Sequence, residues 1–280
     1  MVKMLGRRRG VSAIISTLLI MVTTMLVLSI TLSFVQGTLT RKTGETDLES
    51  AKTFMKNVAL QIDDVAWTNG RVDTAHFTTQ FGLFEFLEDV VSYNVTFTNS
   101  TGSTFIRIYD SNIFMFNIPT YRYSLSENYY ELILPKQFDG ISFIGSNSPI
   151  ARVFAVQNST VGNAEFIRVT VVPVFRIQNY TVRINANSTT NYVRLYLPEL
   201  NNTYSSDLPK TIVLTGTSVN TELFSNINKI EIKVDFPLAL SPDNYNNKFF
   251  KFPEPLSQVI NFDVSNVEVF LGGVNVDYGA

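Results

Sequence analysis

The feature that most constrains this chain is an uncharged stretch near its N-terminus. No Asp, Glu, Lys or Arg occurs from Val11 to Thr40. As an α-helix this stretch would be about 45 Å long at 1.5 Å per residue, whereas the hydrocarbon core of a bilayer is roughly 30 Å thick. Its apolar residues are not confined to one helical face. We therefore expect a transmembrane helix rather than a helix that lies on the membrane surface.

A basic leader precedes this helix and contains Lys3, Arg7, Arg8 and Arg9. The positive-inside rule then places the N-terminus in the cytoplasm and the body outside, as a single-pass protein of the cell membrane. The apolar run is longer than that of a secretory signal, and no Ala-x-Ala cleavage site follows it. We therefore expect the helix to stay with the mature protein. One interpretation is an ordinary uncleaved signal anchor.

The junction between leader and helix supports a second interpretation. Its sequence is Arg7-Arg8-Arg9-Gly10 followed by Val11-Ser12-Ala13-Ile14-Ile15. This order resembles the class III signal peptide of archaeal type IV pilins, a resemblance confined to the leader and the helix. It implies that a prepilin peptidase cuts between Gly10 and Val11. Bacterial type IV pilins carry glutamate at the fifth mature position, so Ile15 favours the archaeal branch.

The resemblance also implies partners and a destination. The membrane, the prepilin peptidase and other pilin subunits would be partners, and the assembled product would be a cell-surface filament. The body is larger than that of common major pilins, which suggests a minor or adhesive subunit whose surface ligand is unknown.

A second helical segment follows the apolar helix. Gly37 and Gly44 bracket a polar stretch where we expect the helix to bend or fray, with a restart at Thr46 or Asp47 as the N-cap. Beyond it, an apolar stripe recurs at helical spacing: Leu48, Ala51, Met55, Val58, Ile62 and Val65. The stripe predicts packing on the chain's own body or on neighbouring helices of a filament, and the first is favoured. Asn69-Gly70 is the expected turn after it.

The rest of the chain shows alternating, β-rich segments separated by turn signals. We expect an α+β protein, in which a long N-terminal hydrophobic helix is followed by a mainly antiparallel β-sandwich. The body forms one sandwich or two packed β-units, and the second is favoured. The expected organisation is a leader (1–10), a transmembrane or assembly helix (11–36), a joint and amphipathic helix (37–68), and β-units at 69–140 and 141–280. We expect a turn at residues 110–112 between two short strands.

Composition excludes several classes of function. The chain has no cysteine, so disulfides and thiolate metal sites are excluded. Its net charge is −2 although the leader is strongly basic, so the body is mildly acidic and gives no case for nucleic acid. His76 is the single histidine, and no nucleophile elbow or phosphate-binding loop occurs. We expect no catalytic site, no metal and no cofactor.

The body carries six Asn-x-Ser/Thr sequences that are candidates for N-glycosylation. They begin at Asn94, Asn99, Asn158, Asn179, Asn187 and Asn201. Four of them lie in turn-like sequence, where a sugar can project, whereas Asn94 and Asn179 lie in or beside expected strands.

Three functional hypotheses remain from the sequence. The first is a pilin-like subunit that is anchored as a precursor and assembles through its N-terminal helix. The second is a single-span membrane-anchored β-ectodomain that binds a surface partner, and the third is a secreted enzyme.

Overall fold

The structure is a computed structural model. It describes residues 7–77, 82–121, 123–126, 128–138, 140–157, 166–185, 188–202, 211–240 and 245–279. The chain divides into two compact units, Met1–Thr46 and Asp47–Ala280. The first unit is helical throughout its described part, and the second contains the β-structure.

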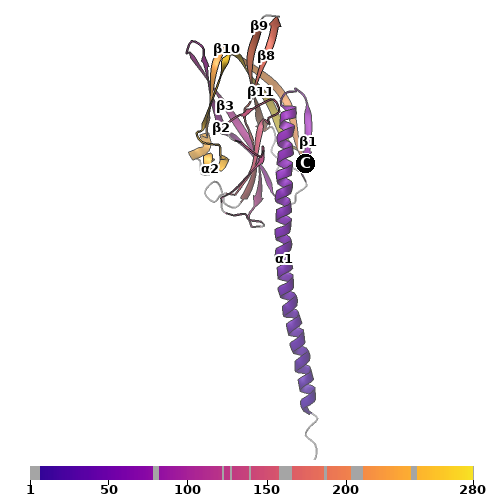
Figure 1. Cartoon of the computed structure of the whole chain (residues 1–280). Helices are drawn as coiled ribbons and strands as arrows, with labels where there is room; N and C mark the ends of the chain where they lie inside the picture. The colour runs from indigo at the N-terminus through magenta and orange to yellow at the C-terminus, as the bar shows by residue number, and fades with distance from the viewer. Residues whose placement is uncertain are drawn as a thin grey trace, which may run out of the picture. The chain divides into compact units, whose positions relative to one another are not determined.

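One long helix and eleven strands account for most of the described chain (Figure 1). The helix α1 comprises Arg7–Val65. The strands are β1 (Val72–His76), β2 (Leu83–Asn99), β3 (Thr104–Pro119), β4 (Tyr129–Leu134), β5 (Phe143–Ile144), β6 (Ala151–Gln157), β7 (Phe166–Pro173), β8 (Arg176–Asn185), β9 (Ser188–Asn202), β10 (Thr211–Asp235) and β11 (Ser257–Gly279). Two short helices, η1 (Pro237–Leu240) and α2 (Asn247–Phe250), lie between the last two strands. The predicted α+β class is confirmed.

The helix α1 is continuous where the sequence predicted an interruption. Helical hydrogen bonding runs through Gly37 and Gly44, and no restart occurs at Thr46 or Asp47. A glycine costs a helix only about 1 kcal/mol, which the cooperative backbone ladder tolerates. The Thr46 hydroxyl donates to the carbonyl of Lys42 within the helix instead of capping a new one.

The strands form one sheet in the order β4-β6-β7-β3-β2-β10-β11-β9-β8-β5, and β1 pairs with β10. Most pairs are antiparallel; β9 with β11 and β5 with β8 are parallel. Strands from both sides of residue 140 share this sheet, because β3 pairs with β7 and β4 pairs with β6.

The long strand β3 replaces a pair of short strands that the sequence predicted. β3 runs through residues 110–112, so the turn predicted there is wrong. β2 has a register shift between Leu87 and Val91, opposite this part of β3, so the irregularity is a bulge in the neighbouring strand. The side chain of Asn112 is used in tertiary contacts: it accepts from the Asp89 amide and donates to the Leu200 carbonyl.

The buried apolar side chains form two clusters on opposite faces of the central strands. The first cluster contains no residue of α1 and includes Phe154 of β6 and Met115 of β3. The second includes the apolar stripe of α1 together with Val153 of β6 and Phe116 of β3. Neighbouring residues of one strand therefore enter different clusters, which explains why β6 and β7 are apolar almost throughout. Within residues 47–280, residues 48–65 of α1 therefore cover one face of the central strands.

Candidate functional site: the two segments of the N-terminal helix

The first part of α1, residues 14–43, is here called the anchor segment. Every side chain in it is exposed, and its large apolar side chains from Ile14 to Leu39 are 44–74% exposed. Its mean hydropathy reaches 2.4 over an 18-residue window. By length and composition this segment can cross a membrane, as the predicted anchor requires, and the orientation of the chain stays a prediction.

Most side-chain hydroxyl groups of the anchor segment donate hydrogen bonds to carbonyl groups of the same helix. Thr23, Thr24 and Thr31 each donate a hydrogen bond to a carbonyl three or four residues earlier, at 2.8–2.9 Å. Because lipid offers no hydrogen-bond partner, this internal bonding lowers the cost of a hydroxyl in hydrocarbon. The threonines are therefore compatible with a membrane span.

The predicted processing site is described only by its backbone. Arg7, Arg8, Arg9, Gly10 and Val11 begin helix α1. Lys3 lies outside the described residues. Cleavage between Gly10 and Val11 therefore stays a prediction.

The later part of α1, residues 48–65, is here called the packed segment. All six residues of the predicted apolar stripe are at most 2% exposed and belong to the helix-side cluster. The stripe therefore packs on the chain's own sheet, as the favoured interpretation predicted. Figure 1 shows this part of α1 lying along the strands.

Two glycines admit the C-terminal end of the packed segment onto the sheet. A Cβ on Gly216 of β10 would lie 2.5 Å from the Val65 carbonyl oxygen and 2.4 Å from that of Thr68. A Cβ on Gly272 of β11 would lie 2.5 Å from the Ala66 oxygen. Any larger residue at either glycine would collide with main-chain atoms, so the end of the helix packs directly against the backbones of β10 and β11.

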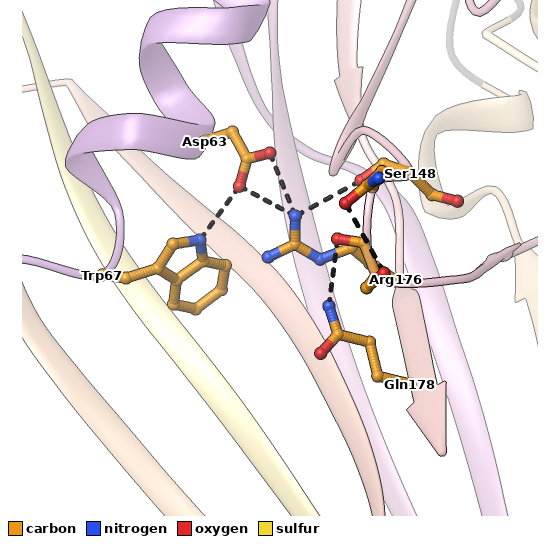
Figure 2. Close-up of polar contacts among 7 residues, drawn as sticks. Asp63, Trp67, Ser148, Arg176 and Gln178 are labelled. Atoms are coloured by element: carbon orange, nitrogen blue, oxygen red, sulfur yellow. Dashed lines mark hydrogen bonds and ion pairs between the residues drawn. The ribbon is translucent and has the colours of Figure 1, made fainter. Parts of the chain in front are cut away.

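A polar cluster fixes the same end of the helix (Figure 2). The Asp63 carboxylate accepts a hydrogen bond from Trp67 Nε1 at 3.1 Å and forms an ion pair with Arg176 of β8 at 3.0 Å. The same guanidinium donates to the Ser148 carbonyl at 3.3 Å and lies 5.0 Å from the Tyr196 ring. Only 11% of the Arg176 side chain is exposed, so this cluster links helix, loop and sheet in a partly dry environment.

A second ion-pair network lies earlier on the packed segment. Lys52 Nζ lies 2.5 Å from the Glu131 carboxylate of β4 and 2.8 Å from that of Glu49. The Tyr129 hydroxyl also donates to Glu131. Burial raises the pKa of Glu131, but the hydrogen bonds from Lys52 and Tyr129 outweigh it, so this pKa is lowered. The network ties the edge strand β4 to the helix.

Neither the glycines under the end of the packed segment nor the Asp63–Arg176 cluster was predicted from the sequence. No local pattern marks Asp63 as part of a cluster, because Arg176 is far away in sequence. The adjacent Gly272 and Gly273 in β11 were a usable signal for the close contact, since glycine in a strand interior often marks a close approach of two backbones.

The six candidate glycosylation sites differ in position. Asn158 and Asn187 lie outside the described residues. Asn99 ends β2, and its Oδ1 accepts from the Thr101 and Ser103 amides in the hairpin turn. Asn94 is half-buried in β2, whereas Asn179 and Asn201 are exposed on β8 and β9. Asn201 therefore lies in a strand rather than in the predicted turn. Occupancy by a sugar stays a prediction.

His76 ends β1, where its Nδ1 lies 3.2 Å from the Thr211 hydroxyl. Among the described residues, no group of three or more His, Cys, Asp or Glu side chains is placed to hold a metal ion.

No protein-family model, curated protein sequence or solved structure matches this chain. The resemblance to archaeal type IV pilins therefore depends on the leader and the apolar helix alone.

Proposed function

We propose that this protein is a pilin-like cell-surface subunit. The precursor is held in the membrane by the anchor segment, and a prepilin peptidase removes the leader between Gly10 and Val11. The processed helix then moves from lipid into a bundle of equivalent helices, and the β-body faces outward as a minor or adhesive subunit. In this proposal the protein has no catalytic activity.

The observation that supports this proposal is the contrast within α1. In one continuous helix, residues 14–40 are uncharged and all their side chains are exposed, whereas the apolar stripe of the packed segment is buried on the sheet. The uncovered segment requires an apolar environment, which lipid supplies in the precursor and neighbouring helices supply in a filament. Removal of the leader takes away the four positive charges that favour the cytoplasmic face.

The decisive measurement is the N-terminus of the native protein, by intact mass or N-terminal sequencing. The proposal predicts a mature chain that begins at Val11. A mature start at Met1 would contradict processing and leave the membrane-anchored ectodomain as the function.

Assembly needs a separate test in the native cell. The Gly10→Trp change should block processing, so the precursor accumulates in the membrane fraction and no filament containing this chain is sheared from cells. The matched control is Gly37→Trp, which places the same side chain in open space on the helix; processing should persist. Filaments that form normally with an unprocessed Gly10→Trp chain would contradict the proposed order of events.

A further inference from the structure

β3 has an unpaired edge near the hairpin that joins it to β2. On one side, Thr104 to Tyr109 pair with β2. On the other side, pairing with β7 begins only at Phe114. Among the described residues no strand covers residues 104–109 on this side, and this segment is here called the open edge.

Hydrogen-bond parity shows which backbone groups the open edge presents. The Asn99 amide donates to the Ser103 carbonyl at 2.9 Å, which makes these two residues a hydrogen-bonded pair. In an antiparallel ladder such pairs alternate. The main-chain groups of Phe105, Arg107 and Tyr109 therefore point toward β2. Those of Thr104, Ile106 and Ile108 point away from it. The Ile106 carbonyl already accepts one hydrogen bond, from Arg107 Nη1 at 3.2 Å, and its second lone pair is left for another strand.

The open edge is apolar as well as unpaired. Ile106 is 56% exposed, Ile108 62% and Phe105 45%. Natural sheets usually protect such edges with charges, proline or a covering loop. Arg107 is the one charge in the segment, and it is already directed toward Glu222 at 3.3 Å and toward the Phe224 ring at 5.7 Å. An exposed apolar edge of this kind is suited to strand addition.

We propose that the open edge pairs with the open edge of a second copy of this chain, antiparallel and across a two-fold axis. Such an interface is isologous, so one residue lies opposite itself. With Ile106 at the axis, Thr104 lies opposite Ile108, and all three outward-pointing residues exchange main-chain hydrogen bonds. Phe105 then lies opposite Arg107 of the second copy, a pairing of an aromatic ring with a cation.

The neighbouring registers are less favourable. An axis at Arg107 sets two like charges directly opposite each other, which destabilises a cross-strand pair. An axis at Ile108 requires the second strand to extend past Asp110, where Asn112 already donates to the Leu200 carbonyl of β9 at 2.7 Å. Self-complementarity at Ile106 is the argument for a second copy as the occupant. The interface lies within residues 47–280 and needs neither processing nor helix assembly.

The absence of cysteine makes a disulfide test direct. Single-cysteine variants of the full chain would be oxidised in detergent micelles that hold less than one chain on average. Directly opposed residues lie about 5.5 Å apart between Cα atoms, within the range that a disulfide spans. Ile106→Cys should give several-fold more disulfide-linked dimer than Thr96→Cys. Thr96 is the matched control, because it is the partner of Ile106 on β2, one strand away from the edge. Equal yields from the two variants would overturn the proposal.

A blocking variant tests the edge without its central side chain. A chain with both Thr104→Cys and Ile108→Cys should also cross-link between copies, because these residues face each other. Adding Ile106→Pro removes an outward-pointing amide but no hydrogen bond to β2, a substitution that edge strands tolerate. The dimer should then be lost while the near-UV circular dichroism of the body is retained. A dimer that persists in the folded proline variant would overturn strand addition.

Discussion

The anchor segment and the packed segment belong to one continuous helix, yet they meet opposite conditions. Apolar side chains in the anchor segment are uncovered, whereas the stripe of the packed segment is buried on the sheet. In both segments the backbone hydrogen bonds are made within the helix. The difference therefore lies in what covers the side chains: the chain supplies a sheet for residues 48–65, whereas the uncharged residues 14–40 need an external apolar medium.

An apolar residue replaced by aspartate should have the largest effect, and a different one in each segment. Ile62→Asp buries a carboxylate at a fully covered position and should lower the free energy of unfolding of the body by at least about 4 kcal/mol. Leu26→Asp should leave that unfolding free energy unchanged in detergent. It should instead weaken membrane insertion by about 2.5–3.5 kcal/mol. Denaturant unfolding and membrane fractionation measure the two effects. If both changes destabilised the body equally, the anchor segment would not be independent of the body's stability as proposed.

The next largest effect on the stability of the body is expected at the glycines that contact the end of the packed segment, Gly216 and Gly272. Gly272→Ala sets a Cβ 2.5 Å from the Ala66 oxygen and should cost about 1–3 kcal/mol, because main-chain atoms must move. Gly37→Ala adds the same atom to open space in the anchor segment and should not lower the stability of the body. Thermal unfolding followed by circular dichroism at β wavelengths compares them. Similar midpoints for the two variants would show that this contact tolerates a side chain.

The two adjacent aspartates should differ from each other. Asp63→Asn weakens a charge-assisted cluster around Arg176 and should cost about 1–2 kcal/mol. Asp64→Asn breaks only the exposed pair with Arg71 and should cost less than about 1 kcal/mol. Trp67 is the single tryptophan and donates to Asp63, so its fluorescence should change in the first variant only. An equal response to both changes would rule out a special role for Asp63.

Acid should loosen the packed segment slightly through Glu131. Its pKa is lowered in the folded state, so its stabilising contribution is complete above the ordinary value of 4.5 and is lost as the pH falls through the folded pKa. Because this side chain is 45% exposed, the contribution should be below about 1 kcal/mol. Comparing unfolding at pH 7 and pH 3 should show a smaller pH dependence in Glu131→Gln than in the unaltered chain. An identical pH dependence of unfolding in the two proteins would show that Glu131 does not contribute to it.

Local patterns predicted an exposed apolar segment and a packed segment, but not that one helix runs unbroken through Gly37 and Gly44. The absence of charge from Val11 to Thr40 specifies a helix that needs an apolar environment, whatever the rest of the chain does. The spacing from Leu48 to Val65 specifies which face of the following segment is buried. Both signals lie within a few turns of one helix, so sequence alone was sufficient.

Turn chemistry was a weaker guide. Asp110, Ser111 and Asn112 are typical turn residues, yet they lie inside β3. The pairing with β2 and the contact of Asn112 with Leu200 favour the extended conformation there. The turn preference of residues 110–112 therefore stabilised the chain less than the pairing of β3 with β2, which a turn would have interrupted.

By itself, then, the sequence determined that a membrane-compatible helix precedes a β-rich body, and it identified the stripe by which that helix meets the body. Only the tertiary structure decided where the helix ends on the sheet, against Gly216 and Gly272 and beside Arg176. Only it left one edge of β3 open. These features join residues far apart in the chain, and no local pattern encodes which strand will lie beside which.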